Sequence, residues 1–94
     1  MKCIAVVWLG HVIPKDRDCY VIVIRLHEGE ILPNKTYRSA DRQIQIKVLK
    51  VDNVVGKELE IANAYGTYGL WLSSVSKVRE DTGPVELFLD NSVA

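Results

Sequence analysis

The sequence has little of what marks a secreted, membrane-embedded or charge-driven protein. Its 94 residues include two cysteines, far fewer than a disulfide-stapled secreted domain of this size carries. Twelve basic residues balance twelve acidic ones, so the zero net charge provides no long-range attraction to a nucleic acid or an anionic membrane. No apolar stretch approaches the length of a bilayer span. Any nucleic-acid site must therefore be a local patch.

The N-terminal segment has a superficial likeness to a secretion signal, because residues 1–9 combine a basic residue with an apolar run. The run is too short, and it stops at Gly10-His11 without a small-residue cleavage pattern. We therefore expect a first strand here and a cytoplasmic protein. In that compartment Cys3 and Cys19 are expected to be reduced thiols that pack as small hydrophobes.

Metal and nucleotide sites are not indicated by the sequence. The sequence alternates cysteine and histidine in a way that suggests a zinc site, at Cys3, His11, Cys19 and His27. It lacks the close Cys-x-x-Cys or His-x-x-x-His pairs that such a site uses. No Gly-x-x-x-x-Gly-Lys-Ser/Thr loop is present to bind a triphosphate. We expect neither a metal nor another cofactor.

The apolar runs are short, rich in valine and isoleucine, and separated by glycine, proline, asparagine and aspartate, a pattern typical of strands joined by turns. Strands are expected over residues 3–9, 19–26, 35–38, 43–51, 58–61, 70–72 and 85–89, with charged or polar connections at 14–18 and 73–84. Gly29 and Asn34 suit turns because both tolerate positive φ. We predict an all-β fold, a small closed or nearly closed antiparallel barrel, as one domain over residues 1–90 with a short tail at 91–94.

The clearest alternation places Ile44, Ile46 and Val48 on one face of a strand. Leu49 and Val51 continue the apolar pattern in the opposite phase, and a slip of one residue would turn the wrong face inward. A β-bulge near Val48-Leu49 would absorb the extra residue. Positions in the strongest strand patterns are expected in the barrel interior, namely Val6, Ile22, Ile46, Leu70 and Leu87.

Four segments in succession carry a moderately specific pattern. Residues 25–37 contain Arg25, Gly29 and Ile31 at the spacing of a Gly-Arg-Val, Gly-x-Ile, Gly-Asp hairpin, and residues 46–51 follow as a strand. An Ala-x-x-Gly-Asp-x-Val-Gly-Leu element is matched at Ala64, Tyr68, Gly69 and Leu70, and residues 82–87 match a Gly-x-Val-Leu start of a closing strand. Together these segments resemble domain 2 of the translational GTPases, the β-barrel that follows the nucleotide-binding domain in elongation factor Tu and its relatives.

This resemblance implies a translation-factor-like barrel that stands without a GTPase domain, with RNA or the ribosome as its partner. In elongation factor Tu the barrel helps to hold the aminoacylated end of transfer RNA, and in other relatives it contacts the ribosome or a neighbouring domain. The chain departs from the family at Ile24 and Asn34, where glycine is usual. Lys50 falls near an acidic position of the tRNA-binding members, which reverses the charge there.

Nothing in the sequence indicates catalysis. His27, Glu28 and Glu30 flank a turn and are expected to be solvated, and the serines of residues 73–76 lack a Gly-x-Ser-x-Gly elbow. We expect a binding module rather than an enzyme.

A basic surface is the first candidate site, because small barrels bind single-stranded nucleic acid with cations and stacking aromatic side chains. We predict a local nucleic-acid surface beside Tyr37 made of Arg38, Arg42, Lys47 and Lys50. The alternative is a solvated face of mixed charge, since acidic residues are interspersed with these cations at Asp41, Asp52, Glu58 and Glu60.

Aromatic residues form the second candidate site. Tyr68 is expected in the core with Leu70 and Leu72, which puts Trp71 on the opposite, outer face. Tyr65 and Trp71 are predicted interface residues, since large aromatic side chains anchor protein contacts. The alternative function is thus a protein-interaction or regulatory module, forming a homodimer through its apolar strands or binding another protein, without nucleic-acid binding.

Overall fold

The computed structural model describes residues 3–9, 13–16, 19–76 and 85–90, with the side chains of residues 8–9, 13–15, 19–73 and 85–90. All regular elements in these ranges are strands. The described part of the chain has no helix that could span a bilayer. In chain order the strands are β1 (Cys3–Trp8), β2 (Ile13–Asp16), β3 (Cys19–Glu28), β4 (Glu30–Ile31), β5 (Lys35–Arg38), β6 (Gln45–Asp52), β7 (Glu58–Leu59), β8 (Ala62–Asn63), β9 (Gly66–Ser76) and β10 (Val85–Leu89).

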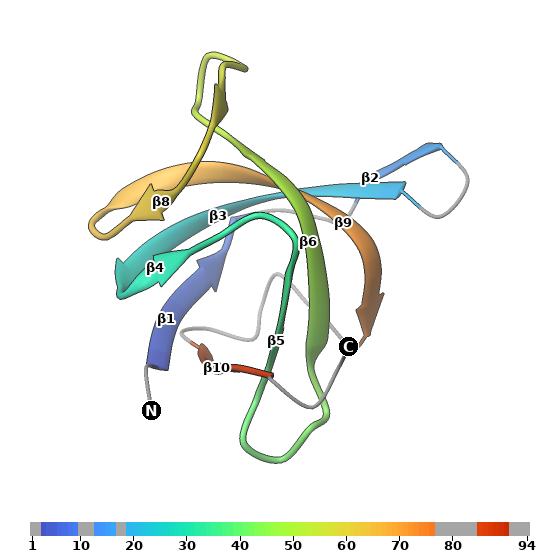
Figure 1. The fold of residues 1–94 in the computed structure, drawn as a ribbon, viewed down its shortest axis with the longest axis vertical. Coiled ribbons are helices and arrows are strands. Elements are labelled where there is room, and N and C mark those ends of the chain that lie inside the picture. The colour runs from blue at the N-terminus through green and yellow to red at the C-terminus, as the bar shows by residue number, and fades with distance from the viewer. Residues whose placement is uncertain (1–2, 10–12, 17–18, 77–84, 91–94) are drawn as a thin grey trace.

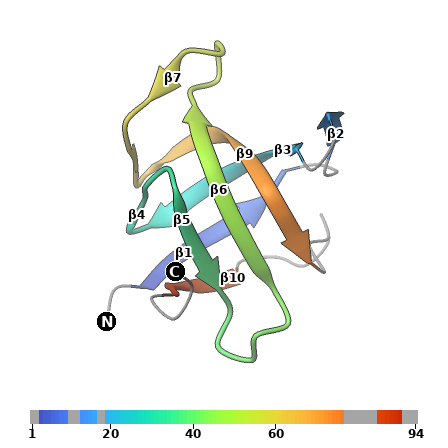
Figure 2. The same ribbon diagram turned by 45° about the vertical axis from the view of Figure 1, so that its right-hand side comes forward.

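Antiparallel pairing joins eight of these strands into one strongly curved sheet (Figures 1 and 2). The strand order is β1-β10-β5-β6-β9-β3-β2, with β7 added to β6 and a further pairing between β1 and β3. β4 and β8 form a separate two-stranded ribbon. The prediction of an all-β, antiparallel fold is confirmed.

The core lies on the concave side of the large sheet, where neighbouring strands contribute side chains in rows. Ile22 on β3 pairs with Leu70 on β9, which pairs with Val51 on β6, and all three side chains are at most 1% exposed. The predicted interior positions with described side chains are all buried: Ile22, Ile46, Leu70 and Leu87. The fifth predicted position, Val6, has a side chain outside the described set. Trp8 on β1 closes the core with 2% exposure.

The predicted β-bulge is confirmed on β6. The register between β6 and β9 shifts on both sides of Val48, and Leu49 has no cross-strand partner in β9. The Leu49 side chain is 37% exposed, whereas Val48 and Val51 are fully buried. Because the bulge changes the phase of the alternation, Lys50 stays on the outer face although it follows the exposed Leu49 directly.

The two predicted turn residues adopt the expected conformations, with φ of 84° at Gly29 and 65° at Asn34. At several other places the chain has more strand than the sequence predicts, among them the short strands β4 and β8. Ile13–Asp16 forms β2 in a segment interpreted as part of a connection, because it pairs as an edge strand with β3. β9 extends over Gly66–Ser76 instead of 70–72, since it pairs with both β3 and β6. The rest of the predicted 73–84 connection, at 77–84, and the predicted tail at 91–94 lie outside the described residues.

We expect Leu70→Ala to lower the free energy of unfolding by about 2–5 kcal/mol, because it removes buried methyl groups and leaves a cavity in the core. Val55→Ala is the matched control, since the Val55 side chain is 83% exposed and its truncation should change stability by less than about 0.5 kcal/mol. Urea unfolding of the two variants measures the difference. Equal midpoints would contradict the central position of Leu70.

Candidate functional site

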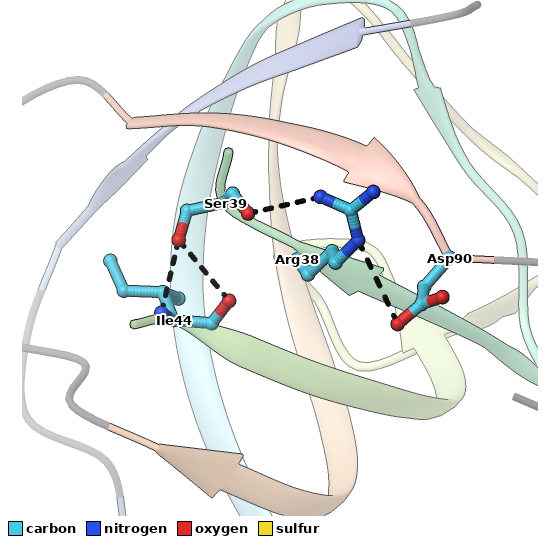
Figure 3. A network of polar contacts seen from close by, with 4 residues as sticks. All are labelled: Arg38, Ser39, Ile44 and Asp90. Atoms are coloured by element: carbon cyan, nitrogen blue, oxygen red, sulfur yellow. Dashed lines mark hydrogen bonds and ion pairs between the residues drawn. The ribbon is translucent and has the colours of Figure 1, made fainter. Parts of the chain in front are cut away.

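The four predicted basic residues lie along β5, β6 and the turn that joins them, but they are not equivalent. Arg38 on β5 turns toward the end of β10, where its Nε lies 3.9 Å from Oδ2 of the buried Asp90 (Figure 3). Its Nη1 donates a hydrogen bond of 3.3 Å to the carbonyl of Ser39. The Arg38 side chain is only 20% exposed, so its charge is compensated mainly within the protein.

The turn over residues 39–44 is held by its own polar groups. Ser39 Oγ accepts a hydrogen bond from Ile44 N at 3.0 Å and donates one to Asp41 Oδ1 at 2.6 Å. Asp41 Oδ1 also accepts from Gln43 N at 3.0 Å. Arg42 sits exposed in this turn with φ of 61°, and its backbone N–H donates to the Ser39 carbonyl. The guanidinium of Arg42 is therefore presented from an ordered turn.

Lys47 and Lys50 lie on the outer face of β6. The Lys47 side chain is exposed and has no hydrogen-bond or ion-pair partner among the side chains that the structure describes. Lys50 is half-buried, with Nζ 4.3 Å from the centroid of the Trp71 ring. This distance is within the range of a cation–π contact.

Trp71 lies on the outer face of β9, as the sequence predicts, and is bracketed by two charges. Its Nε1 donates a hydrogen bond of 2.7 Å to Asp52 Oδ2, while Lys50 covers the ring. The indole is partly exposed. Cross-strand neighbours thus create a cation, an aromatic ring and a carboxylate at one place. Lys47 lies three residues before Lys50 on the same strand, with the exposed Leu49 between them.

Tyr65, the other predicted interface residue, lies far from Trp71. It immediately precedes β9, so six residue steps separate the two positions by about 20 Å along the strand. Tyr65 is 65% exposed and packs edge-to-face on His27, with ring centroids 5.1 Å apart. The two predicted interface residues therefore belong to different surfaces.

Tyr37 does not belong to the basic surface, contrary to the sequence interpretation. Its side chain is 4% exposed because it pairs with the inward-facing Ile46, and its hydroxyl accepts a hydrogen bond from Leu32 N at 3.0 Å. Tyr68 is partly buried against the core, in agreement with the sequence, and its hydroxyl donates to the Asn63 carbonyl at 2.7 Å.

Sequence reasoning missed two carboxylates and a set of exposed apolar residues. Asp90 compensates Arg38 and Asp52 orients Trp71, yet both pairings join residues far apart in the chain. Among the described side chains outside the turns, the exposed large apolar ones are Leu9, Ile13, Val23 and Leu49. The one available signal is the period of two along β3, which puts Val23 on the face opposite to that of the buried Ile22 and Ile24.

Comparisons with known proteins give no further assignment. No model of a protein family matches the chain. No curated protein matches it either. Within the described residues, no three His, Cys, Asp or Glu side chains are grouped so that they could hold a metal ion.

Burial in the core raises the pKa of Tyr37 above its ordinary value of 10.0; the hydrogen bond from Leu32 opposes this shift and nearby Glu30 adds to it. Above pH 10 the unfolded chain therefore loses this proton before the folded chain does, and stability falls as pH rises. Tyr37→Phe should make that fall shallower, although it costs about 0.5–1.5 kcal/mol at neutral pH through the lost hydrogen bond. Urea unfolding from neutral to alkaline pH measures both effects, and identical alkaline slopes for the two proteins would contradict the assignment.

Proposed function

We propose that this chain is a non-catalytic, cytoplasmic binding module built on a β-barrel of the translation-factor domain 2 type. The strand pairings support a barrel, because β1 pairs with both β10 and β3, and β10, β5, β6, β9 and β3 each pair with two of the same six strands. The order of sequence segments that resembles the translational GTPases supports the type.

The partner that we propose is RNA, alone or within the ribosome, bound on the outer face of β6. The observation that carries this proposal is that Lys47, exposed and without a side-chain partner among the described residues, lies on the same outer face of β6 as the Lys50–Trp71 pair. A phosphate backbone is attracted by such cations, and an aromatic ring next to them offers a stacking platform for a base. Lys50 would exchange its contact with the ring for one with a phosphate.

Arg42 is the third cation of this proposed surface, after Lys47 and Lys50. Its positive φ is a region that costs an arginine of order 1 kcal/mol and a glycine nothing. Such a cost favours a role for the side chain rather than for the backbone of the turn. Arg38 is given a positioning role instead, since its contacts to Asp90 and the Ser39 carbonyl support the base of the same turn.

A protein-interaction module is the second candidate function. It is favoured by a specific observation, namely that Leu9, Ile13 and Val23 are each at least 43% exposed on neighbouring strands. A contiguous exposed apolar surface is typical of protein contacts and contributes little to binding a phosphate backbone.

We expect the double variant Arg42→Gln, Lys47→Gln to bind a short unstructured RNA more weakly than the parent protein does. If both side chains contact phosphates, the slope of log K against log salt should fall in magnitude by about 1.4, because each contact with a single strand contributes about 0.7. Fluorescence anisotropy over about 50–200 mM salt measures the affinity and the slope.

The matched control is Lys15→Gln, Lys57→Gln, which removes the same charge from exposed positions on β2 and on the β6–β7 turn. This control should keep most of the affinity. If both double variants lose the same RNA affinity, the loss comes from net charge and not from this surface. If the parent protein does not bind RNA at low salt, the RNA partner is ruled out.

A further inference from the structure

The outer face of the sheet carries two parallel rows of side chains over β6, β9, β3 and the strands beyond β3. Cross-strand pairing aligns the first row, which consists of Lys50, Trp71, Val21 and Ile13. The second row consists of Asp52, Gly69 and Val23, one outward position further along β6, β9 and β3, and of Leu9, which follows β1 and donates its backbone N–H to the Val23 carbonyl. The buried Val51, Leu70 and Ile22 lie between the rows on the opposite face, which confirms that both rows point outward.

These rows form an apolar face with charge confined to one side. Ile13, Val23 and Leu9 are 52%, 44% and 43% exposed, and Val21 and Trp71 are partly exposed. Lys50 and Asp52 mark the β6 side. An exposed apolar surface of this extent on neighbouring strands is typical of an interaction site.

Gly69 lies in the middle of this face, and the fold does not require a glycine there. The register around it is regular, its φ is not positive, and an added Cβ would meet only Asp52 Cβ, at an ordinary 3.8 Å. Gly66 differs, because a Cβ there would come within 2.9 Å of the Tyr68 hydroxyl. A glycine inside a strand reduces stability, and where the fold does not need it, it commonly marks close approach of another chain.

We propose that this face binds a second copy of the same chain, with the two sheets packed face to face around a two-fold axis. An axis that runs across the strands between the two rows places each first-row position opposite the second-row position of the same strand in the second copy. In this dimer Trp71 exchanges its contacts with Lys50 and Asp52 of its own chain for the notch at Gly69 of the second copy, and Lys50 faces the second copy's Asp52. Lys50 and Trp71 are then covered, so this dimer and the RNA complex proposed above exclude one another. The apolar positions match in a similar way. Val21 faces Val23 on β3, and Ile13 on β2 faces Leu9, because Ile13 and Leu9 flank β3 on the same side.

Self-complementarity is what identifies the occupant. Trp71, the bulkiest side chain of the face, stands in the first row of β9, and Gly69, which has no side chain, stands in the second row of the same strand. The two charges of the rows are divided in the same way on β6, because Lys50 stands in the first row and Asp52 in the second. A two-fold operation exchanges the rows, so one contact satisfies both copies at once.

Charge reversal with mixing tests the proposal. Lys50→Glu places a carboxylate opposite Asp52 of the second copy, and Asp52→Lys places an ammonium opposite Lys50, so each variant alone should be monomeric at concentrations where the parent is dimeric. An equimolar mixture of the two variants should restore a dimer, because both contacts are then between opposite charges. Sedimentation velocity measures the three states, and Lys57→Glu is the control that should remain dimeric.

Gly69→Thr provides an independent readout. The threonine side chain fills the notch, and its higher strand propensity should raise the free energy of unfolding. This variant should unfold at a higher urea concentration than the parent, measured at a dilution where both are monomeric, and it should lose the dimer. If Gly69 had only a structural role, its substitution would not raise the free energy of unfolding and at the same time weaken the dimer.

Three results would overturn the proposal: a parent protein that stays monomeric at high concentration, single charge variants that still dimerise, or a mixture that stays monomeric. If the parent is monomeric but Gly69→Thr abolishes binding to another protein, that protein rather than a second copy occupies the face.

Discussion

The change of phase on β6 is the constraint on which the other features of this structure depend. Ile46 and Val48 face the core, and an unbroken alternation would turn Lys50 inward and Val51 outward. The bulge at Leu49 prevents this, so that Val51 completes the core row with Leu70 while Lys50 and Asp52 remain outside. Burying an unpaired lysine would cost far more than the ladder hydrogen bonds that a bulge disrupts. The bulge thus both fills the core and places Lys50 and Asp52 beside Trp71 on the outer face.

Local alternation explains how much of the fold the sequence predicts. Ile22, Ile46 and Leu70 are predictable as interior residues because each belongs to one of the strongest strand patterns, and a phase slip is itself visible in the sequence. Tyr37 was misplaced because β5 is a short strand without alternation. Its burial is decided by pairing with Ile46 and Leu89, neither of which is near it in the chain.

The candidate site was less predictable than the core for a related reason. The positions of the basic residues follow from strand phase, but their availability depends on partners from other strands. Asp90 reaches Arg38 only because β10 pairs with β5, and Asp52 reaches Trp71 only because β6 pairs with β9. A sequence with equal numbers of acids and bases leaves such pairings open, since any cation has several possible partners. The register of strand pairing, rather than composition, therefore determines which cations have a carboxylate partner within the protein and which are available to a ligand.

The edge of the sheet gives a reason why association would use a face rather than strand addition. Among the described strands, β2 pairs with β3 alone, and its other edge is the natural place for a further strand. Pro14 stands within β2 and has no N–H to donate, while Lys15 and Asp16 place charges beside it. These residues oppose addition of a strand at that edge. The apolar side chains Ile13, Val21 and Val23 next to it have no such protection, so the outer face is where a partner gains most by excluding water.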